Sequence, residues 1–379
     1  MLDVAEGTGV AIYARVLATC VQDAGASAVI LDDQSPGARD RNRLGRWLSA
    51  MATTGRDAAP RGGAPGAQER LSAHDIFREA QVFFNLHGRL LPVRCAQPPA
   101  VMHWTYPVPL FVEGARNLYT VHDLIPLTDP DLTGIPRGRH DRLLRRVAKQ
   151  AAMLVTVSEA TRTAVLRELA PAAPPVFNTL QAIEAPLQRD PALPATLRSG
   201  RYFLFCGTVE PRKNLSRLIA AHAASQVDQP LVIVGPEAEG HGSLETLIAA
   251  APNVMRLPYQ PRADLLGLIR RARALLFPSL AEGFGLPIAE AMTLGCPVLT
   301  SDRGAPAEIG GDAALLVAPL DELGLAEAIR ALSTDDALCA RLRAAGFARA
   351  RRFTPQAYGR RLRALYAEAL APTPQGDAA

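Results

Sequence analysis

Cysteine is scarce in this sequence and is not arranged for cross-linking. The 379 residues contain an odd number of cysteines, and no two of them form a C-x-x-C pair. This spacing argues against a disulfide framework and against a structural zinc site. Because unpaired thiols are typical of a reducing compartment, we expect a cytoplasmic protein. The cysteines are Cys20, Cys95, Cys206, Cys296 and Cys339, of which the third and fourth stand in apolar runs and are predicted core residues.

Long apolar runs and a strong net charge are missing as well. No run is long enough to span a bilayer, and no secretory signal pattern is recognisable. The formal net charge of +4 is too small to indicate nucleic acid, and no nucleic-acid motif accompanies it. We therefore expect no nucleic-acid partner. Membrane contact, if made, would be peripheral, at the inner face of the plasma membrane.

The length and the apolar content predict two domains. At 379 residues the chain exceeds the usual limit of one hydrophobic core, and 48% of it is apolar. Short apolar runs alternate with helical patterns in the second half, which is typical of a parallel, doubly wound α/β sheet. A proline-rich stretch near residue 190 is the best linker candidate. The predicted divisions are 1–187, a linker at 188–200, a second domain at 201–354, a last helix at 355–371 and a tail at 372–379.

The first half is less regular. Residues 34–75 are rich in Gly, Ala, Arg and Pro, and they are predicted to be a mobile insertion with a short helix at RNRLGRWLSAM. QVFFNLHG is a strand candidate. The apolar stub MLDV is short for a first strand, so either the sheet edge is shortened or the start codon is misassigned.

The stretch PSLAEGFGLPIAEAMTLGCPVLTS, at 278–301, organises the second half. It predicts a buried strand, a tight glycine turn and a helix that stops at Gly295. Such a turn leaves backbone N–H groups at the positive end of a helix dipole, which attracts anions and hydroxyl-rich ligands. Glu282 precedes the turn, and Glu290 lies two helical turns into the helix, so both carboxylates can border one crevice. The alternative is a glycine loop with two surface glutamates.

Two cations and one histidine follow other predicted strands. Arg212 and Lys213 come just before a helix, where positive charge opposes the helix dipole, so a bound diphosphate explains them better than helix stabilisation does. His122 leaves the carboxyl end of a strand, where open α/β sheets place ligand groups. A lone histidine is more often structural, but its pairing with Asp123 favours a function. Asp123 itself is expected to order the turn.

Three further segments allow two interpretations each. Asp129-Pro130-Asp131 has the D-x-D spelling of metal-dependent transferases, but it sits in a proline turn, so we expect turn chemistry and no metal. GIPRGRHDRLLRRVAKQAA predicts a basic amphipathic helix, which could lie on anionic lipid or be simply solvated. The segment around Trp47 also allows two interpretations: contact with a membrane or a lipid-linked acceptor, or a solvated loop. The cations concerned are Arg41, Arg43, Arg46, Arg137, Arg139, Arg142, Arg145, Arg146 and Lys149.

Five stretches in order resemble one protein family. EGFGLPIAE has the E-x7-E form of retaining GT-B glycosyltransferases of glycosyltransferase family 4. TGVAIYAR, TVHDLIPL with TVSEATR, GTVEPRKNLSRLI and LVIVGP resemble the same family in the expected order, from about Gly7 to about Tyr366. The resemblance implies two Rossmann-like domains facing a central cleft, with a C-terminal helix that crosses back to the first domain.

The resemblance also implies the ligands and the roles of the site residues. The donor is a nucleotide diphosphate-sugar, with GDP-mannose as the first expectation and UDP-glucose as the second, and no cofactor is needed. Arg212 and Lys213 neutralise the leaving diphosphate, Glu290 accepts from the ribose hydroxyls, and His122 approaches the transferred sugar. Glu282 and the turn that follows it contact sugar hydroxyls; the turn residues are Gly283, Phe284, Gly285 and Leu286. Pro258 and Tyr259 contact the base. Gly7 and Gly9 face the diphosphate or the acceptor.

The implied reaction transfers a hexose with retention of configuration to a glycan or lipid-linked acceptor, as in surface polysaccharide synthesis. No carboxylate is a clear nucleophile, so the expected mechanism has the acceptor enter on the leaving-group face. Two alternatives stay open: a non-catalytic, nucleotide-sugar-binding partner subunit, or a nucleotide-sugar epimerase of the same fold.

Overall fold

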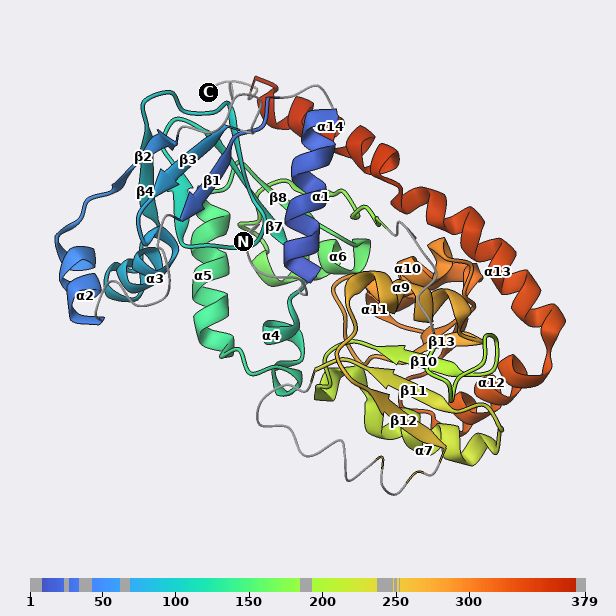
Figure 1. The fold of residues 1–379 in the computed structure, drawn as a ribbon. Coiled ribbons are helices and arrows are strands. Elements are labelled where there is room, and N and C mark those ends of the chain that lie inside the picture. Colours follow the sequence, from blue (N-terminus) through green and yellow to red (C-terminus); the bar gives the residue numbers. More distant parts are fainter. Residues whose placement is uncertain are drawn as a thin grey trace.

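Six parallel strands form the sheet of the C-terminal lobe, in the order β12-β11-β10-β13-β14-β15 (Figure 1). The central strands are apolar throughout and fully buried, as expected where helices cover both faces of a sheet. The chain order reverses between β10 and β13, and doubly wound sheets bind ligands beside such a reversal. The strands are β10 (Phe203–Cys206), β11 (Leu231–Val234), β12 (Val254–Leu257), β13 (Ala274–Phe277), β14 (Val298–Ser301) and β15 (Leu315–Val317).

Helices follow the strands of this sheet along the chain and connect one strand to the next. The computed structural model describes residues 9–23, 27–33, 43–61, 69–184, 193–236, 248, 251 and 253–372. The C-terminal helices are η2 (Pro211–Lys213), α7 (Leu215–Ser225), α9 (Arg262–Arg271), α10 (Leu286–Thr293), α11 (Gly304–Gly310), η3 (Gly311–Ala313), α12 (Glu322–Thr334), α13 (Asp336–Ala350), η4 (Arg351–Phe353) and α14 (Pro355–Leu370).

The N-terminal lobe contains two sheets, β1-β3-β2-β4-β6 and β5-β7-β8-β9, and only the pair β2–β3 is antiparallel among the described strands. The predicted basic helix is confirmed as α5, which buries Leu144 and Val147. The strands are β1 (Ile30–Asp33), β2 (Arg56–Arg61), β3 (Arg70–Ala73), β4 (Leu91–Cys95), β5 (Val101–Trp104), β6 (Leu110–Val112), β7 (Arg116–Val121), β8 (Met153–Thr156) and β9 (Val176–Asn178). The helices are α1 (Gly9–Asp23), α2 (Arg43–Ala52), α3 (Ile76–His87), α4 (Ile125–Thr128), η1 (Pro130–Leu132), α5 (Arg137–Gln150) and α6 (Glu159–Leu169).

The segment 34–75 is more regular than predicted. Helix α2 confirms the short helix, but β2 and β3 are strands in the middle of the first sheet, so the segment is not a mobile insertion over its described parts. Buried ion pairs attach it to α3: Arg46 donates to Asp75 at 2.6 Å, and Arg56 pairs with Glu79. Residues 34–42 and 62–68 lie outside the described residues.

The predicted strand QVFFNLHG is wrong, because these residues belong to α3. Its buried positions include Ile76, Ala80, Phe83 and Phe84, which repeat with the period of a helix rather than of a strand. Gly88 ends the helix in a left-handed conformation with its N–H bonded to the Phe84 carbonyl. Adjacent phenylalanines resemble a strand locally, and the helical period is visible only from Ile76 onward.

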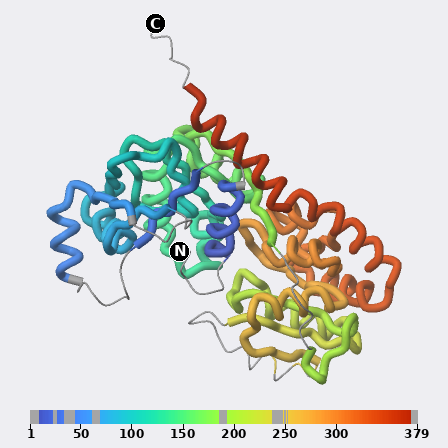
Figure 2. Tube along the Cα trace, turned by 45° about the horizontal axis from the view of Figure 1, so that its top comes forward, coloured from blue at the N-terminus to red at the C-terminus, as the bar shows by residue number. Residues whose placement is uncertain are grey.

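The last helix returns to the N-terminal lobe, as predicted. Helices α13 and α14 run along the molecule from the second lobe to the first, where α14 lies beside α1 (Figure 1, Figure 2). His103 bonds the Tyr366 hydroxyl at 2.9 Å, and Arg361 donates to the Thr179 carbonyl at 2.9 Å. These contacts join the two lobes into the two-domain α/β fold that was expected.

Two expectations cannot be compared with the structure. The MLDV stub and Gly7 lie outside the described residues, as does 185–192, the first part of the linker region. Of the rest, Leu197 is buried in the hydrophobic cluster that includes the strands of the C-terminal sheet. The exact domain boundaries stay a prediction. None of the helices in the described ranges combines the length and the apolar character that a membrane crossing requires.

Candidate active site

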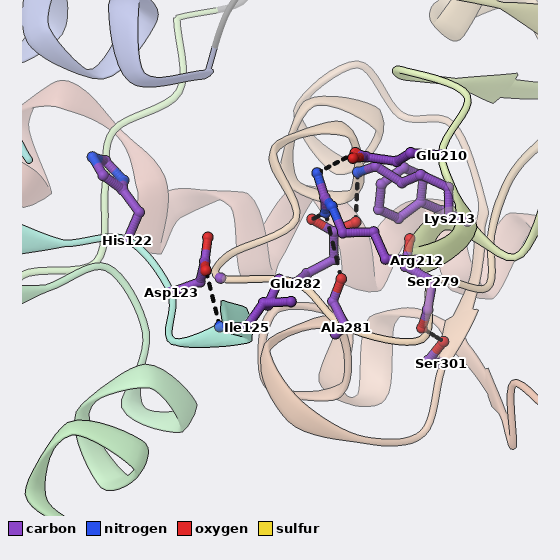
Figure 3. Close-up of polar contacts among 12 residues, drawn as sticks. His122, Asp123, Ile125, Glu210, Arg212, Lys213, Ser279, Ala281, Glu282 and Ser301 are labelled. Carbon is purple, nitrogen blue, oxygen red and sulfur yellow. Dashed lines mark hydrogen bonds and ion pairs between the residues drawn. The ribbon is translucent and has the colours of Figure 1, made fainter. Parts of the chain in front are cut away.

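Two cations and two carboxylates form one cluster at the reversal point of the C-terminal sheet (Figure 3). Arg212 and Lys213 follow β10, and Glu282 follows β13, so the neighbouring strands bring them together. The Glu282 carboxylate accepts from Arg212 Nη1 at 2.8 Å and from Lys213 Nζ at 2.5 Å. Arg212 also pairs with Glu210 at 2.6 Å and donates to the Ala281 carbonyl. The predicted cations and the first predicted glutamate therefore meet.

The cluster is buried enough for its charges to perturb one another. Burial raises the pKa of the Glu282 carboxyl, but Lys213 and Arg212 lower it further, so the net shift is downward. Burial lowers the pKa of Arg212, whereas the two carboxylates raise it, with a net upward shift. The Lys213 ammonium also lies 4.6 Å from the centre of the Phe277 ring. Glu282 and Arg212 are therefore held in their charged forms.

The glycine turn presses against the N-terminal lobe. A methyl group on Gly283 would lie 2.1 Å from the His122 carbonyl oxygen, so only glycine fits there. The Gly283 carbonyl accepts from Ser158 Oγ at 2.7 Å and from Thr161 Oγ1 at 3.2 Å, both of them N-terminal residues. Gly285 has a φ of 99°, which favours glycine as the cap of α10. The turn thus joins the two lobes beside the charged cluster.

His122 lies on the opposite side of this junction, at the carboxyl end of β7 (Figure 3). Its Nε2 bonds the Thr105 carbonyl at 2.8 Å. Burial lowers its pKa, while the bond to Thr105 and the Asp123 carboxylate raise it, and the net shift is downward. Asp123 accepts from the Ile125 N–H at 3.0 Å, so it orders the turn, as expected. Asp123 also lies between His122 and the Arg212 cluster (Figure 3).

Glu290 is separate from the cation cluster and has its own partner. It is buried inside α10, with 2% of its surface exposed, and its Oε1 accepts from Arg262 Nη2 at 2.5 Å. Cys206, at the carboxyl end of β10, lies within electrostatic range of both sets of charges. Burial raises the pKa of its thiol, Glu290 raises it further, and Lys213 and Arg262 lower it. The second predicted glutamate therefore pairs with a cation outside the cluster, and within the described residues no hydrogen bond or ion pair joins it to Arg212 or Lys213.

The remaining predicted residues lie at the start of α1, in the glycine turn and after β12. Gly9 begins α1 and faces Leu286, whose Cδ1 would lie 3.0 Å from a methyl group on the glycine. The Phe284 side chain is buried against Phe353, at 5.6 Å between ring centres, so only its backbone is available to a ligand. Pro258 and Tyr259 follow β12, and Tyr259 is 65% exposed. Among the described residues, the side-chain hydrogen bonds and ion pairs of Arg212 and Lys213 go to other groups and not to these four.

A second contact between the lobes was not predicted. Glu308 on α11 accepts from the N–H groups of Glu159 and Ala160, at 2.8 Å each, with its two carboxylate oxygens. These groups are the first donors of α6 in the other lobe, and a carboxylate there is favoured by the helix dipole. Glu308 therefore caps a helix across the lobe junction.

Sequence patterns did not identify Glu210, Arg262 and Glu308 as site residues. Glu210 lies two positions before Arg212, so its signal is an acidic residue close to the paired cations in the sequence. Arg262 opens a helix, where the dipole argument applied to Arg212 holds equally. No local signal identifies Glu308, because its partners are 149 and 148 residues away.

The aspartates of the D-x-D spelling occupy a turn, as expected. Asp129 accepts from the Thr128 hydroxyl at 2.7 Å, and Asp131 lies in η1. Over the part of the chain that the structure describes, no group of three or more His, Cys, Asp or Glu side chains is arranged to hold a metal ion.

Solved structures share this architecture. Sucrose-phosphate synthase from Thermosynechococcus elongatus matches with a TM-score of 0.69 at 19% identity, covering 97% of this chain and 95% of that one. An E. coli structure described as trehalose-6-phosphate bound with UDP-2-fluoro glucose matches with a TM-score of 0.60 at 12% identity, covering 91% of this chain and 99% of that one. Two Rossmann-like lobes with a long returning helix define the GT-B fold.

The sequence comparisons identify the family. The family model described as glycosyl transferases group 1 matches residues 195–349. O-antigen chain mannosyltransferase B of Escherichia coli is 31% identical over 254 residues, which cover 63% of this chain and 67% of that protein. The chain belongs to the group 1 glycosyltransferases, the retaining hexosyltransferases of glycosyltransferase family 4. The resemblance carried by the five sequence stretches is thereby confirmed.

Proposed function

We propose that this protein transfers a mannosyl residue from GDP-mannose, with retention, to a glycan or lipid-linked acceptor in surface polysaccharide synthesis. The observation that carries the proposal is the Arg212–Lys213–Glu282 cluster at the reversal point of the C-terminal sheet. Mannose is favoured because the similar Escherichia coli protein is an O-antigen chain mannosyltransferase. UDP-glucose is the second candidate donor, since a structure of the same fold is described with a UDP-sugar analogue.

In this proposal the cations bind the diphosphate of the donor. The contacts of Arg212 with Glu210, Glu282 and Ala281 leave guanidinium N–H donors for phosphate oxygens. The two glutamates hold the cations in position before the donor arrives, which lowers the cost of ordering them. Glu282 and the N–H groups at the start of α10 bind sugar hydroxyls, Glu290 accepts from the ribose, and the backbone at Pro258 and Tyr259 contacts the base.

The proposed chemistry follows from this placement. The bond between the anomeric carbon and the β-phosphate oxygen breaks through an oxocarbenium-like state, and the acceptor hydroxyl bonds to the same face of that carbon. The acceptor proton passes to the departing phosphate oxygen. Arg212 and Lys213 stabilise the negative charge that develops on this phosphate. His122, across the lobe junction, contacts the transferred sugar.

The N-terminal lobe offers a surface for a lipid-linked acceptor. On α2 the apolar residues Leu44, Trp47, Leu48 and Met51 recur at helical spacing, and each is more than 40% exposed. Arg142 of α5 lies over the Phe84 ring of α3, and α3 packs against α2, so α3 contacts both the basic helix and the helix with the apolar stripe. An exposed apolar stripe and exposed cations in one lobe favour peripheral contact with an anionic membrane. We propose that this contact brings the protein to the membrane that carries the lipid-linked acceptor.

The donor assignment is tested by thermal shift with GDP-mannose, GDP, UDP-glucose and UDP. A donor at ~100 times its dissociation constant should raise the free energy of unfolding by roughly 2.7 kcal/mol. We expect GDP-mannose to give the largest shift.

We also expect Arg212→Ala and Glu290→Ala to abolish transfer while the variants stay folded. Arg341 is an exposed residue on α13, and Arg341→Ala should behave as wild type.

Diphosphate release with and without acceptor separates the competing functions. A transferase releases GDP faster when the acceptor is added, and the product keeps the α configuration of the donor. An epimerase forms product without any acceptor, and a partner subunit binds the donor but releases nothing. Wild-type turnover in both alanine variants would refute the residue assignments.

A further inference from the structure

Arg262 stands at a position in its helix where a cation is unfavourable. It is the first residue of α9, where its positive charge opposes the helix dipole, and Asp264 is the acidic residue of that first turn. Its side chain instead extends to α10, where Nη2 donates to Glu290 Oε1 at 2.5 Å. Arg262 is therefore explained by its partner and not by the helix that it begins.

Glu290 needs such a partner. An unpaired charge on a side chain with 2% exposure would be costly to bury. A carboxylate paired with a guanidinium is compensated, and its two oxygens can both accept hydrogen bonds. Arg262 supplies the compensating charge and fixes the direction of one oxygen. Within the described part of the chain, Oε1 is the Glu290 side-chain oxygen with a bonded partner, which leaves Oε2 for another donor.

The pair joins two segments that follow strands of the C-terminal sheet. Arg262 begins α9, which follows β12, and Glu290 lies in α10, which follows β13, so the pair connects the two sides of the reversal point. Glu290 belongs to the same strand–turn–helix as Glu282, whose carboxylate bonds Arg212 and Lys213. The pair is therefore linked through this segment to the cluster that would hold the diphosphate.

We propose that Arg262 is a positioning residue for ribose recognition. It holds Oε1 and fixes the direction of the carboxylate, so that Oε2 accepts from the 2′- and 3′-hydroxyls of a ribonucleotide donor. The protein then discriminates against donors that lack these hydroxyls. This inference rests on the proposed role of Glu290 in donor binding.

The test compares ribonucleotides with analogues that lack the diol. Binding of GDP and 2′,3′-dideoxy-GDP is measured by titration calorimetry for wild type, Arg262→Gln and Arg262→Lys, and UDP with its dideoxy analogue is used if wild type binds UDP more tightly. We expect wild type to prefer the ribonucleotide by at least about tenfold, as a hydrogen bond to a charged group implies. In Arg262→Gln the preference should fall below about threefold, and Arg262→Lys should restore part of it. Arg341→Gln, on exposed α13, is the matched control.

The ratio of the two affinities separates positioning from general damage. A merely structural role of Arg262 would weaken both nucleotides equally, and a wild-type ratio in a folded Arg262→Gln variant would overturn the inference. If Arg262→Gln does not fold, the ratio in Arg262→Lys decides, because a wild-type ratio there contradicts a need for the guanidinium. If wild type binds neither nucleotide, the proposed function fails. If it binds both forms equally, donor binding stands and the ribose assignment is wrong.

Discussion

Gly283 has only a hydrogen atom as its side chain, and this lets its backbone approach the N-terminal lobe closely. Any larger side chain would need the space taken by the His122 carbonyl oxygen, which would be 2.1 Å from the added carbon. The neighbouring Glu282 is bonded to Arg212 and Lys213, so moving the turn also moves the charged cluster. The identity of this residue is therefore set by a contact with the other lobe and not by its own turn alone.

We expect Gly283→Ala to lower kcat/KM by about 100-fold, because a displacement of ~1 Å in a catalytic group has an effect of that size. The measurement is the transfer rate, with the thermal midpoint recorded to show that the variant is folded. Gly138→Ala on exposed α5 is the control, since nothing lies within 4 Å of the added carbon there. An unchanged rate in Gly283→Ala would show that the turn tolerates movement and that its contact with His122 is unimportant.

Single site residues could be predicted where a residue type is unfavourable in its local structure. Arg212 and Lys213 stood out because cations at a helix start are unfavourable, and the structure pairs them with Glu282 and Glu210. The same reasoning was not applied to Arg262, although it too begins a helix. Its partner Glu290 is 28 residues away, and a sequence gives no register between two helices.

Among the elements, α14 depends on a buried polar network for its position on the N-terminal lobe. His103 bonds Tyr366 through Nδ1 and Thr120 through Nε2, at 2.9 Å each. Burial lowers the pKa of His103 to about 3, and the nearby His122 adds to the shift. The folded protein therefore keeps this imidazole neutral at pH values where an exposed histidine would be charged.

This histidine should make the protein sensitive to acid. The unfolded chain binds a proton at His103 below about pH 6.5, whereas the folded chain does not until about pH 3, so the free energy of unfolding falls as the pH drops through this interval. In His103→Gln we expect the slope to flatten by up to about 1.4 kcal/mol per pH unit. Urea unfolding at several pH values measures it.

His74→Gln, at an exposed position before α3, should leave the slope as in wild type. An equal slope in His103→Gln and wild type between pH 6.5 and 4 would mean that the buried imidazole is already protonated in the folded state, contrary to this account.

Elements of the C-terminal lobe were easier to predict than those of the N-terminal lobe. The buried strands β10, β11 and β13 are continuous apolar runs of four residues bounded by turn signals. By contrast, β2 reads RDAAPR and owes its conformation to its neighbours β3 and β4. Pairing partners decide the structure of such a strand, because its own residues have little preference for it.

For the whole molecule, polar contacts beside the charged cluster add to the packing of α14 in setting the relative position of the lobes. Glu308 caps α6 across the junction with two bonds of 2.8 Å, and Ser158 and Thr161 bond the Gly283 carbonyl nearby. Arg349 supports Glu308 by donating to the Ile309 carbonyl at 2.6 Å. These contacts hold His122 and the Arg212 cluster on facing sides of one junction.

We expect Glu308→Gln to favour an open arrangement of the lobes. The amide keeps one acceptor oxygen but loses the second bond and the charge at the helix terminus, a change of about 1.4 kcal/mol and thus about tenfold in population. Small-angle scattering should show a larger radius of gyration, and transfer should slow. Glu327→Gln, exposed on α12, is the control. A closed, fully active Glu308→Gln protein would contradict this role.

Local sequence was sufficient for the fold class, for the strand–turn–helix at 278–301 and for the cations that follow β10, because each is a pattern of a few adjacent residues. The partners of those residues depended on tertiary contacts. Arg262 meets Glu290, Glu308 meets α6, and Gly283 meets His122 because strands and helices distant in the chain pack side by side. Hydrophobic burial is non-directional and specifies that such elements pack, but not which polar groups are brought together, so these pairs are visible only in three dimensions.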